Sequence, residues 1–432
     1  MAAAITEEQS RKRVKHSQSI DRISDLPESV ICHILSFLRT KCSVRTSILS
    51  RRWMHLWSYV PNLLFHNENQ EIINSVMLLH KVQTIDIFRL FHIECSDYQL
   101  RTWLTFAVAR NVQRLDLCFH SKEDVRGFLP RCLFTCKTLV AMRLRSCGVI
   151  PAVHGAVCLP HLKKLHLIYI RFEADESLTH LISGCPVLLE LSIKLSHAMV
   201  CCNVSSPTIK RLMLDFKSDG TRLEINTPAL KYLKISDSFS EHIKCGALNS
   251  LTKADINLIN DDNKPDYFLY SRSLLELIDQ FRNVKCLKLV LSYCPKIIDS
   301  VVYAWTTSFP KLTRLQLTAD IRFISMFLKN TENLEFLILS ELCEEIEGWM
   351  EPLQNVPTCL LSHLKIINIV NIKGKKHELE IIKYLLRNAN VLERMEILYP
   401  GSLSSNEENN MLKKISLFQR GSRACKVAFG AA

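Results

Sequence analysis

The sequence lacks the motifs on which most nucleotide-binding and hydrolytic enzymes depend. Its 432 residues include only 11 glycines, and none is spaced as a phosphate-binding loop. It also lacks the Gly-x-Ser-x-Gly turn of serine hydrolases, and His377-Glu378 is not followed by the second histidine of a zinc-protease helix. We therefore expect neither catalysis nor a bound cofactor in this chain.

Paired cysteines are absent too, although 17 cysteines are present. They are scattered, without Cys-x-x-Cys units or a His-x-x-x-His pair, which excludes the usual zinc and disulfide frameworks. An apolar signal segment and an apolar run of membrane-spanning length are both missing. We expect reduced, mostly buried thiols in a soluble nuclear and/or cytoplasmic protein.

The composition is that of a globular chain with an ample core, 47% hydrophobic and 23% charged, with a formal net charge of +12. The charge is compatible with an acidic protein partner, with nucleic acid, or with a basic surface that only contacts water. Nucleic acid is the weakest of these, because the basic runs lack interleaved aromatic residues.

The first 20 residues are polar, with Arg11-Lys12-Arg13-Val14-Lys15 at their centre. Such an arm is expected to be disordered. Two interpretations stay open for its basic cluster, a nuclear-import signal and a solvated tail.

Residues 21–66 are helical in pattern and differ from all that follows. Pro27 and Glu28 suit the first turn of a helix, and Thr40 or Ser43 is expected to cap the next one. Three apolar sets at helical spacing predict three short helices. The sets are Val30, Ile34, Leu35 and Leu38; Val44, Ile48 and Leu49; and Trp53, Leu56 and Trp57.

A segment of about forty residues is at the lower limit for burying its own core, so some of these side chains are expected to contact a partner. The alternative is a helical cap on the rest of the chain. Particular residues carry a resemblance: Leu26-Pro27, Ile34-Leu35-Ser36-Phe37-Leu38, Thr46-Ser47, Leu49-Ser50-Arg51-Arg52-Trp53 and Leu56-Trp57. Together they resemble the F-box of plant F-box proteins.

The resemblance implies docking on a Skp-family adaptor, which sits on a cullin scaffold with a RING subunit. By family likeness, one group of residues packs on the adaptor or holds the three helices together. It consists of Leu26, Pro27, Ile34, Leu35, Leu38, Val44 and Trp53.

From residue 67 to 355 one phrase recurs: an apolar residue, two others, an apolar residue, one other, an apolar residue. It begins with Val82-Ile85-Ile87, is regular in Leu162-Leu165-Leu167, and persists to Leu392-Met395-Ile397 beyond this range. Each phrase predicts a short strand whose alternate residues point inward, and stacking such units buries a continuous core. We expect an irregular leucine-rich-repeat solenoid, an α/β horseshoe with strands on its concave side and helices such as 273–281 and 321–330 outside.

Residues 356–432 form a distinct C-terminal region, and within it residues 356–397 predict a strand, a turn at 373–375, a helix over 377–388 and a final strand. The signature residues here are Cys359-Leu360-Leu361-Ser362, Gly374, Glu378 and Lys383-Tyr384-Leu385-Leu386-Arg387-Asn388-Ala389. They resemble the FBD region that ends many plant F-box/leucine-rich-repeat proteins. Physically, this region is expected to cap the open end of the solenoid.

The residues between the inward-pointing apolar positions should line the concave face. They are mostly basic from the third to the tenth phrase, although Asp116, Glu190, Asp215, Asp255 and Glu396 are interspersed. We hypothesise that this face binds an acidic or phosphorylated segment of a target protein. The alternative is that its lysines merely solvate an exposed sheet. The candidate residues are Arg143, Arg145, Lys164, His166, Arg211, Tyr232, Lys234 and Lys288.

The leading functional hypothesis is the substrate-recognition subunit of an SCF-type cullin-RING ubiquitin ligase, in which the F-box binds the adaptor and the repeats bind the target. It acts by proximity and performs no chemistry itself. The alternative is a leucine-rich-repeat scaffold or inhibitor that recruits no ligase. Adaptor binding separates the two.

Overall fold

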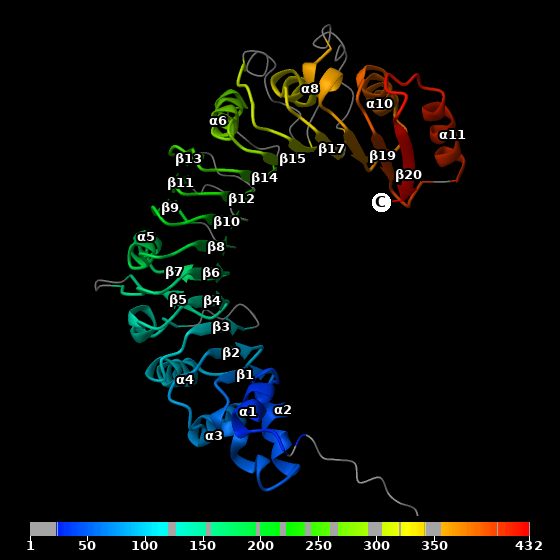
Figure 1. The fold of residues 1–432 in the computed structure, drawn as a ribbon. Helices are drawn as coiled ribbons and strands as arrows, with labels where there is room; N and C mark the ends of the chain where they lie inside the picture. The colour runs from blue at the N-terminus through cyan, green and yellow to red at the C-terminus, as the bar shows by residue number, and fades with distance from the viewer. Residues whose placement is uncertain are drawn as a thin grey trace, which may run out of the picture.

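The computed structural model shows a curved solenoid (Figure 1). A helical segment lies at one end and helices α10 and α11 lie at the other, while the strands follow the inner side of the curve. The predicted basic arm, residues 1–20, lies outside the described residues. The structure describes residues 23, 25–119, 127–152, 157–195, 199–216, 222–237, 243–259, 267–292, 305–318, 321–340, 342, 356–403 and 405–431.

One 15-stranded sheet runs through the molecule, and all of its neighbouring strands are parallel. This architecture confirms the predicted α/β horseshoe. In order, its strands are β1 (Asn62–His66), β2 (Ile87–Phe91), β3 (Arg114–Cys118), β4 (Ala141–Arg145), β6 (Lys164–Ile168), β8 (Glu190–Leu195), β10 (Arg211–Phe216), β12 (Tyr232–Asp237), β14 (Lys253–Ile259), β15 (Cys286–Ser292), β16 (Arg314–Thr318), β17 (Phe336–Ser340), β18 (Ile366–Val370), β19 (Arg394–Tyr399) and β20 (Lys426–Ala431).

The recurring apolar phrase forms the core of this solenoid. In β6, Leu165 and Leu167 are fully buried, as is Leu162 before the strand. Leu165 lies beside Leu191 of β8 in register, so equivalent side chains stack from repeat to repeat. A single repeat has no means of covering such a face, and stability therefore comes from stacking.

The first repeat motif lies three residues further along the chain than predicted. Val82-Ile85-Ile87 was expected, but the buried triad is Ile85, Phe88 and Leu90, three residues further on. Both triads satisfy the same spacing, and only pairing with β1 and β3 decides between them. The sheet also extends one strand beyond the predicted phrases at each end, through β1 and β20. β1 lies inside the range assigned to the F-box.

The outer side carries helices where the repeats are long and strands where they are short. The three-stranded sheet β13-β11-β9 covers the shortest repeats, around β8 to β14, because too few residues remain there for a helix. The helices expected over 273–281 and 321–330 correspond to α6 and α8. The outer elements are α3 (Gln70–Leu79), α4 (Asp97–Ala109), η3 (Arg131–Thr135), β5 (Val149–Ile150), β7 (Arg171–Phe172), α5 (Glu176–Ser183), β9 (Cys201–Ser205), β11 (Arg222–Asn226), β13 (Ile243–Cys245), α6 (Tyr267–Asp279) and α8 (Ile321–Asn330).

The N-terminal helical segment comprises α1 (Glu28–Ser36), α2 (Thr40–Arg45), η1 (Thr46–Ile48) and η2 (Trp53–Tyr59). The third helix expected from the sequence, which begins at Trp53, is a 3-10 helix. Neither Thr40 nor Ser43 caps α2, because Arg39 occupies the N-cap. The Thr40 hydroxyl instead accepts a hydrogen bond from the Leu64 N–H of β1, at 2.7 Å, which ties the segment to the sheet.

The C-terminal region comprises α9 (Thr358–Ser362), β18, α10 (Lys376–Asn388), β19, α11 (Ser405–Ser416) and β20. Gly374 has a φ of +79°, which glycine adopts without strain. The buried Glu378 carboxylate accepts hydrogen bonds from the Lys373 and Lys375 N–H groups at 3.0 and 2.8 Å. These two signature residues thus shape the turn that enters α10, and their role is structural.

Candidate functional site

The surface of the N-terminal helical segment is unusually apolar. In α1, Ile31 and Leu35 point into the segment's small core, where they meet Trp53 and Leu56. Large side chains beside this buried stripe are exposed: Val30 and Ile34 on α1, and Phe37 and Leu38 directly after the helix ends, which are 39%, 43%, 74% and 37% exposed. Val30 and Ile34 are four residues apart, so they lie on one side of α1.

A second group of exposed apolar side chains lies after α2. Ile48 is 87% exposed and Leu49 is 64% exposed, although both belong to an apolar set at helical spacing. The third member of that set, Val44, is half-buried and packs against the core of the repeats together with Trp57. We refer to Val30, Ile34, Phe37, Leu38, Ile48 and Leu49 as the apolar docking surface. Such groups on a small segment are typical of a protein interface.

The residues predicted for adaptor binding divide into two sets in the structure. Pro27, Ile34 and Leu38 are exposed, whereas Leu35 and Trp53 are buried and hold the helices together. Leu26 packs at the edge of the small core, and Val44 faces the repeats.

Four members of the apolar docking surface, Val30, Phe37, Ile48 and Leu49, were not among the candidates. Sequence spacing reveals an apolar face but not which way it points. The small size of the segment was the sequence feature that indicated exposed apolar side chains.

The concave face of the sheet is charged. Side chains that alternate with the buried leucines form three parallel rows across the strands, because every strand pairs in register with the next. The first row contains the first residue of each strand, such as Lys164 and Arg211.

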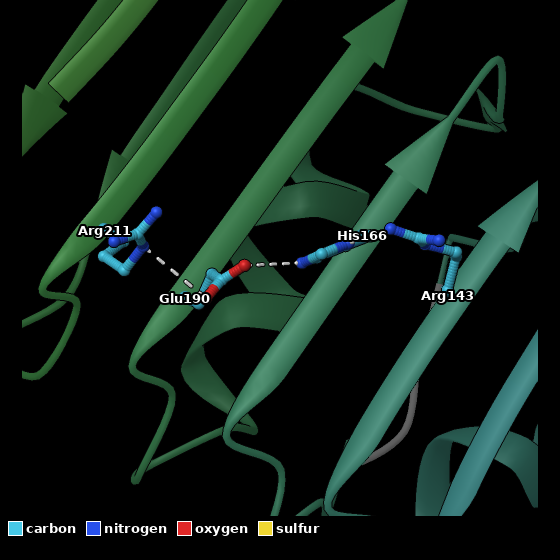
Figure 2. Close-up of polar contacts among 4 residues, drawn as sticks. All are labelled: Arg143, His166, Glu190 and Arg211. Carbon is cyan, nitrogen blue, oxygen red and sulfur yellow. Dashed lines mark hydrogen bonds and ion pairs between the residues drawn. The ribbon is translucent and has the colours of Figure 1, made fainter. Parts of the chain in front are cut away.

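Four side chains form a connected network at the centre of this face (Figure 2). Arg143 Nη2 lies 3.3 Å from His166 Nδ1, and His166 Nε2 lies 2.9 Å from Glu190 Oε1. Arg211 Nε lies 3.7 Å from the other Glu190 oxygen. Since an arginine only donates, Nδ1 accepts from Arg143 and the Nε2–H group donates to Glu190. The network joins strands β4, β6, β8 and β10 and carries more positive than negative groups.

A second contact lies further along the strands, where Lys194 Nζ and Asp215 Oδ2 are 2.5 Å apart. Lys194 donates a hydrogen bond to the Asp215 carboxylate, and this bond raises the pKa of Lys194, so its ammonium stays charged at neutral pH. The ring of Tyr169 lies 5.7 Å from the same ammonium. Because both partners are about one-third exposed, the pair shapes the surface more than it stabilises the fold.

Tyr232 lies between two cations. The Arg211 guanidinium is 5.0 Å from its ring centroid and the Lys253 ammonium is 5.6 Å away. Burial, followed by the Asp255 charge, raises the pKa of the Tyr232 phenol. Its hydroxyl therefore stays protonated and retains a hydrogen to donate.

The other predicted concave residues are distributed along the face. Lys164 and Lys234 are exposed, and Lys234 and Lys288 lie on either side of Asp255 in neighbouring strands. Arg145 is half-buried, and its Nε has no hydrogen-bond partner. The predicted residues therefore share one face and do not converge on a pocket.

Two negative findings concern only the described part of the chain. No group of three or more His, Cys, Asp or Glu side chains there is arranged to hold a metal ion. No helix among those residues has the length and apolarity that crossing a membrane requires.

Three family models match the chain in succession. Residues 23–65 match the F-box domain, and residues 100–254 match the leucine-rich repeats of the FBD-associated F-box protein At5g56370. Residues 351–397 match the FBD region.

Relatives in Arabidopsis thaliana match nearly the whole chain. The F-box/FBD/LRR-repeat protein At1g78750 is 30% identical over 96% of this chain and 98% of its own length. The FBD-associated F-box protein At4g10400 is 31% identical over 95% of this chain and 100% of its own length. F-box/LRR proteins generally act in substrate recognition by SCF ubiquitin ligases and are typically non-catalytic.

Proposed function

Because the chain belongs to the plant F-box/FBD/leucine-rich-repeat family, we propose that it is the substrate-recognition subunit of an SCF-type cullin-RING ubiquitin ligase. In this proposal the apolar docking surface binds a Skp-family adaptor. The concave face binds the target protein.

The observation that supports adaptor binding most directly is the exposure of large apolar groups next to a core that is already complete. The small core is filled by Ile31, Leu35, Trp53 and Leu56, so Phe37 and Ile48 have no role in holding the segment together. Leaving them in water costs free energy that a partner recovers on binding.

The mechanism is proximity. A target held on the concave face is brought close to the ubiquitin carrier of the complex, which raises its effective concentration without a covalent step by this chain. The Thr40–Leu64 hydrogen bond and the packing of Val44 and Trp57 on the repeats favour a fixed orientation between the two surfaces. A fixed orientation favours modification of lysines at a defined place on the target.

The excess of cations on the concave face supports an acidic or phosphorylated target segment. Reversal of Lys164, Arg211 and Lys234 to Glu should abolish its capture.

The basic cluster at residues 11–15 supports a nuclear and/or cytoplasmic location. A fluorescent fusion with and without these residues tests this proposal.

Binding of the purified chain to a plant Skp-family adaptor, measured by calorimetry, tests the proposal. The variant F37A/I48A/L49A should bind at least about a hundredfold more weakly, as expected for the loss of interface hot spots. The matched control Y98A/L417A removes apolar side chains that are 78% and 85% exposed but lie outside the docking surface, and it should bind like the parent. Circular dichroism checks the folding of both variants.

If the parent chain binds no adaptor, ligase recruitment is wrong. The second candidate function, a repeat scaffold or inhibitor without ligase recruitment, then replaces it.

A further inference from the structure

From β3 to β16, the cations of the first concave row occupy alternate strands. Between them lie Ala141, Glu190, Tyr232 and Cys286, each on the intervening strand. We call these cations the basic row. It consists of Arg114 on β3, Lys164 on β6, Arg211 on β10, Lys253 on β14 and Arg314 on β16.

The register of the sheet sets the spacing of this row. Neighbouring strands lie about 4.8 Å apart, so cations on alternate strands are about 10 Å apart. A peptide in the polyproline II conformation advances about 3.1 Å per residue and has three residues per turn, so every third side chain lies on the same side and about 9 Å further along. A segment that crosses the strands in this conformation would present an acidic residue to each cation when its acids recur at every third position.

The cations of the basic row are accessible to solvent, and aromatic rings contact some of them before any ligand binds. All of its members are exposed. The Arg314 guanidinium lies 4.2 Å from the Phe336 ring centroid, and Arg211 and Lys253 flank the ring of Tyr232. Rings that hold the cations in place reduce the side-chain entropy lost when an anion binds. Glu190, the one carboxylate in the row between β3 and β16, already contacts His166 and Arg211.

We propose that the basic row binds an extended acidic segment of the target protein that crosses the strands and carries negatively charged side chains at every third residue. The proposal rests on the proposed function only in assigning this segment to a ubiquitination target. Aspartate and phosphoserine share the required chemistry, and the experiment distinguishes them.

A nucleic acid fits this face less well. In a DNA duplex each strand carries one phosphate per about 3.4 Å of helix axis, a denser array than the row of cations. Asp116, Asp215 and Asp255 in the other two rows would also repel a continuous polyanion. Separate carboxylates on a peptide avoid those positions.

Fluorescence anisotropy with labelled synthetic peptides tests the proposal on the full chain. One peptide carries Asp at every third position with Ser between, and a second has the same composition with all Asp in one block. A third has phosphoserine in place of each Asp. We expect the spaced Asp peptide to bind about tenfold more tightly than the block peptide. Tighter binding of the spaced phosphoserine peptide than of the spaced Asp peptide would indicate a phosphorylated target.

Neutralisation of the row supplies the matched test. K164Q/K253Q/R314Q removes three members, and the control R101Q/K329Q/K383Q removes the same charge from exposed positions of the outer helices α4, α8 and α10. The first variant should bind the spaced peptide about tenfold more weakly, and the control should bind it like the parent. Equal affinity for spaced and block peptides, equal weakening by both variants, or tighter binding of single-stranded RNA of the same length would overturn the proposal.

Adaptor binding by the same preparations separates this proposal from the proposed function. Loss of peptide discrimination with intact adaptor binding overturns the basic row alone. Peptide discrimination without adaptor binding overturns ligase recruitment and leaves the basic row as a peptide site.

Discussion

The apolar docking surface and the concave face differ because the two regions of the chain bury their apolar side chains to different extents. The N-terminal helical segment is too small to bury its apolar residues, so Phe37 and Ile48 remain exposed. From β1 to β19 the sheet buries one side of each strand, and its other side carries charged residues such as Lys164 and Arg211. An apolar surface suits a partner that is always present, whereas a charged face gives selectivity and fast exchange of targets.

Interior and surface residues of the N-terminal segment should respond in opposite ways, and this gives the largest expected effect. W53A removes a buried indole from the small core and should destabilise the segment by about 3–5 kcal/mol. F37A removes a ring that is 74% exposed and should change the free energy of unfolding by less than about 0.5 kcal/mol while weakening adaptor binding. Chemical denaturation and calorimetry measure the two quantities. Similar stability of the two variants would show that the core is assigned wrongly.

Salt should separate the two surfaces. Raising the ionic strength from about 0.1 M to about 1 M shortens the screening length from about 10 Å to about 3 Å. The affinity of the spaced acidic peptide should fall by about tenfold or more, and the affinity for the adaptor should change by less than about threefold, because apolar burial is not screened. A steep salt dependence of adaptor binding would contradict the assignment of its interface to the apolar docking surface.

Removal of Glu190, the acid that lies between Lys164 and Arg211 of the basic row, should strengthen peptide binding. E190Q leaves Arg211 without its carboxylate partner at 3.7 Å and takes a negative charge away from the peptide's path. We expect the spaced peptide to bind about threefold more tightly, by anisotropy. The control E176Q removes an exposed carboxylate from the outer helix α5 and should have no effect. Weaker binding by E190Q would mean that the network is needed intact.

The alkylation rates of buried and exposed cysteines should show the smallest effect. Burial raises the pKa values of Cys185 and Cys202 to about 12, so these thiols should not react at neutral pH. Cys42 on α2 and Cys158 in the repeats are exposed. An adaptor on the apolar docking surface should slow alkylation of Cys42 about threefold or more and leave Cys158 unchanged, as measured by mass spectrometry. Equal rates with and without the adaptor would move its footprint away from α2.

The repeat pattern made most of the fold predictable, because each strand records its own burial in alternate residues. Leu165 and Leu167 identify β6 without reference to any neighbour. The first repeat failed because Val82-Ile85-Ile87 and Ile85-Phe88-Leu90 satisfy the same spacing. The choice between them depends on pairing across the sheet, which lies outside the local sequence.

The candidate sites were predictable in kind but not in detail. The period of two places Arg143, His166 and Arg211 on the concave face, but their contact through Glu190 depends on the register of three strand pairs. In the N-terminal segment, helical spacing identified apolar faces and gave no direction for them. Ile48 was therefore placed in a helix set, although the structure exposes it.

The two proposals together give one chain two independent surfaces, one for an adaptor and one for a target. Sedimentation of the chain with a Skp-family adaptor and the labelled spaced peptide tests their independence. We predict a ternary complex in which the affinity for each ligand changes by less than about twofold when the other is bound. Displacement of the peptide by the adaptor, or no complex with the adaptor at all, would contradict it.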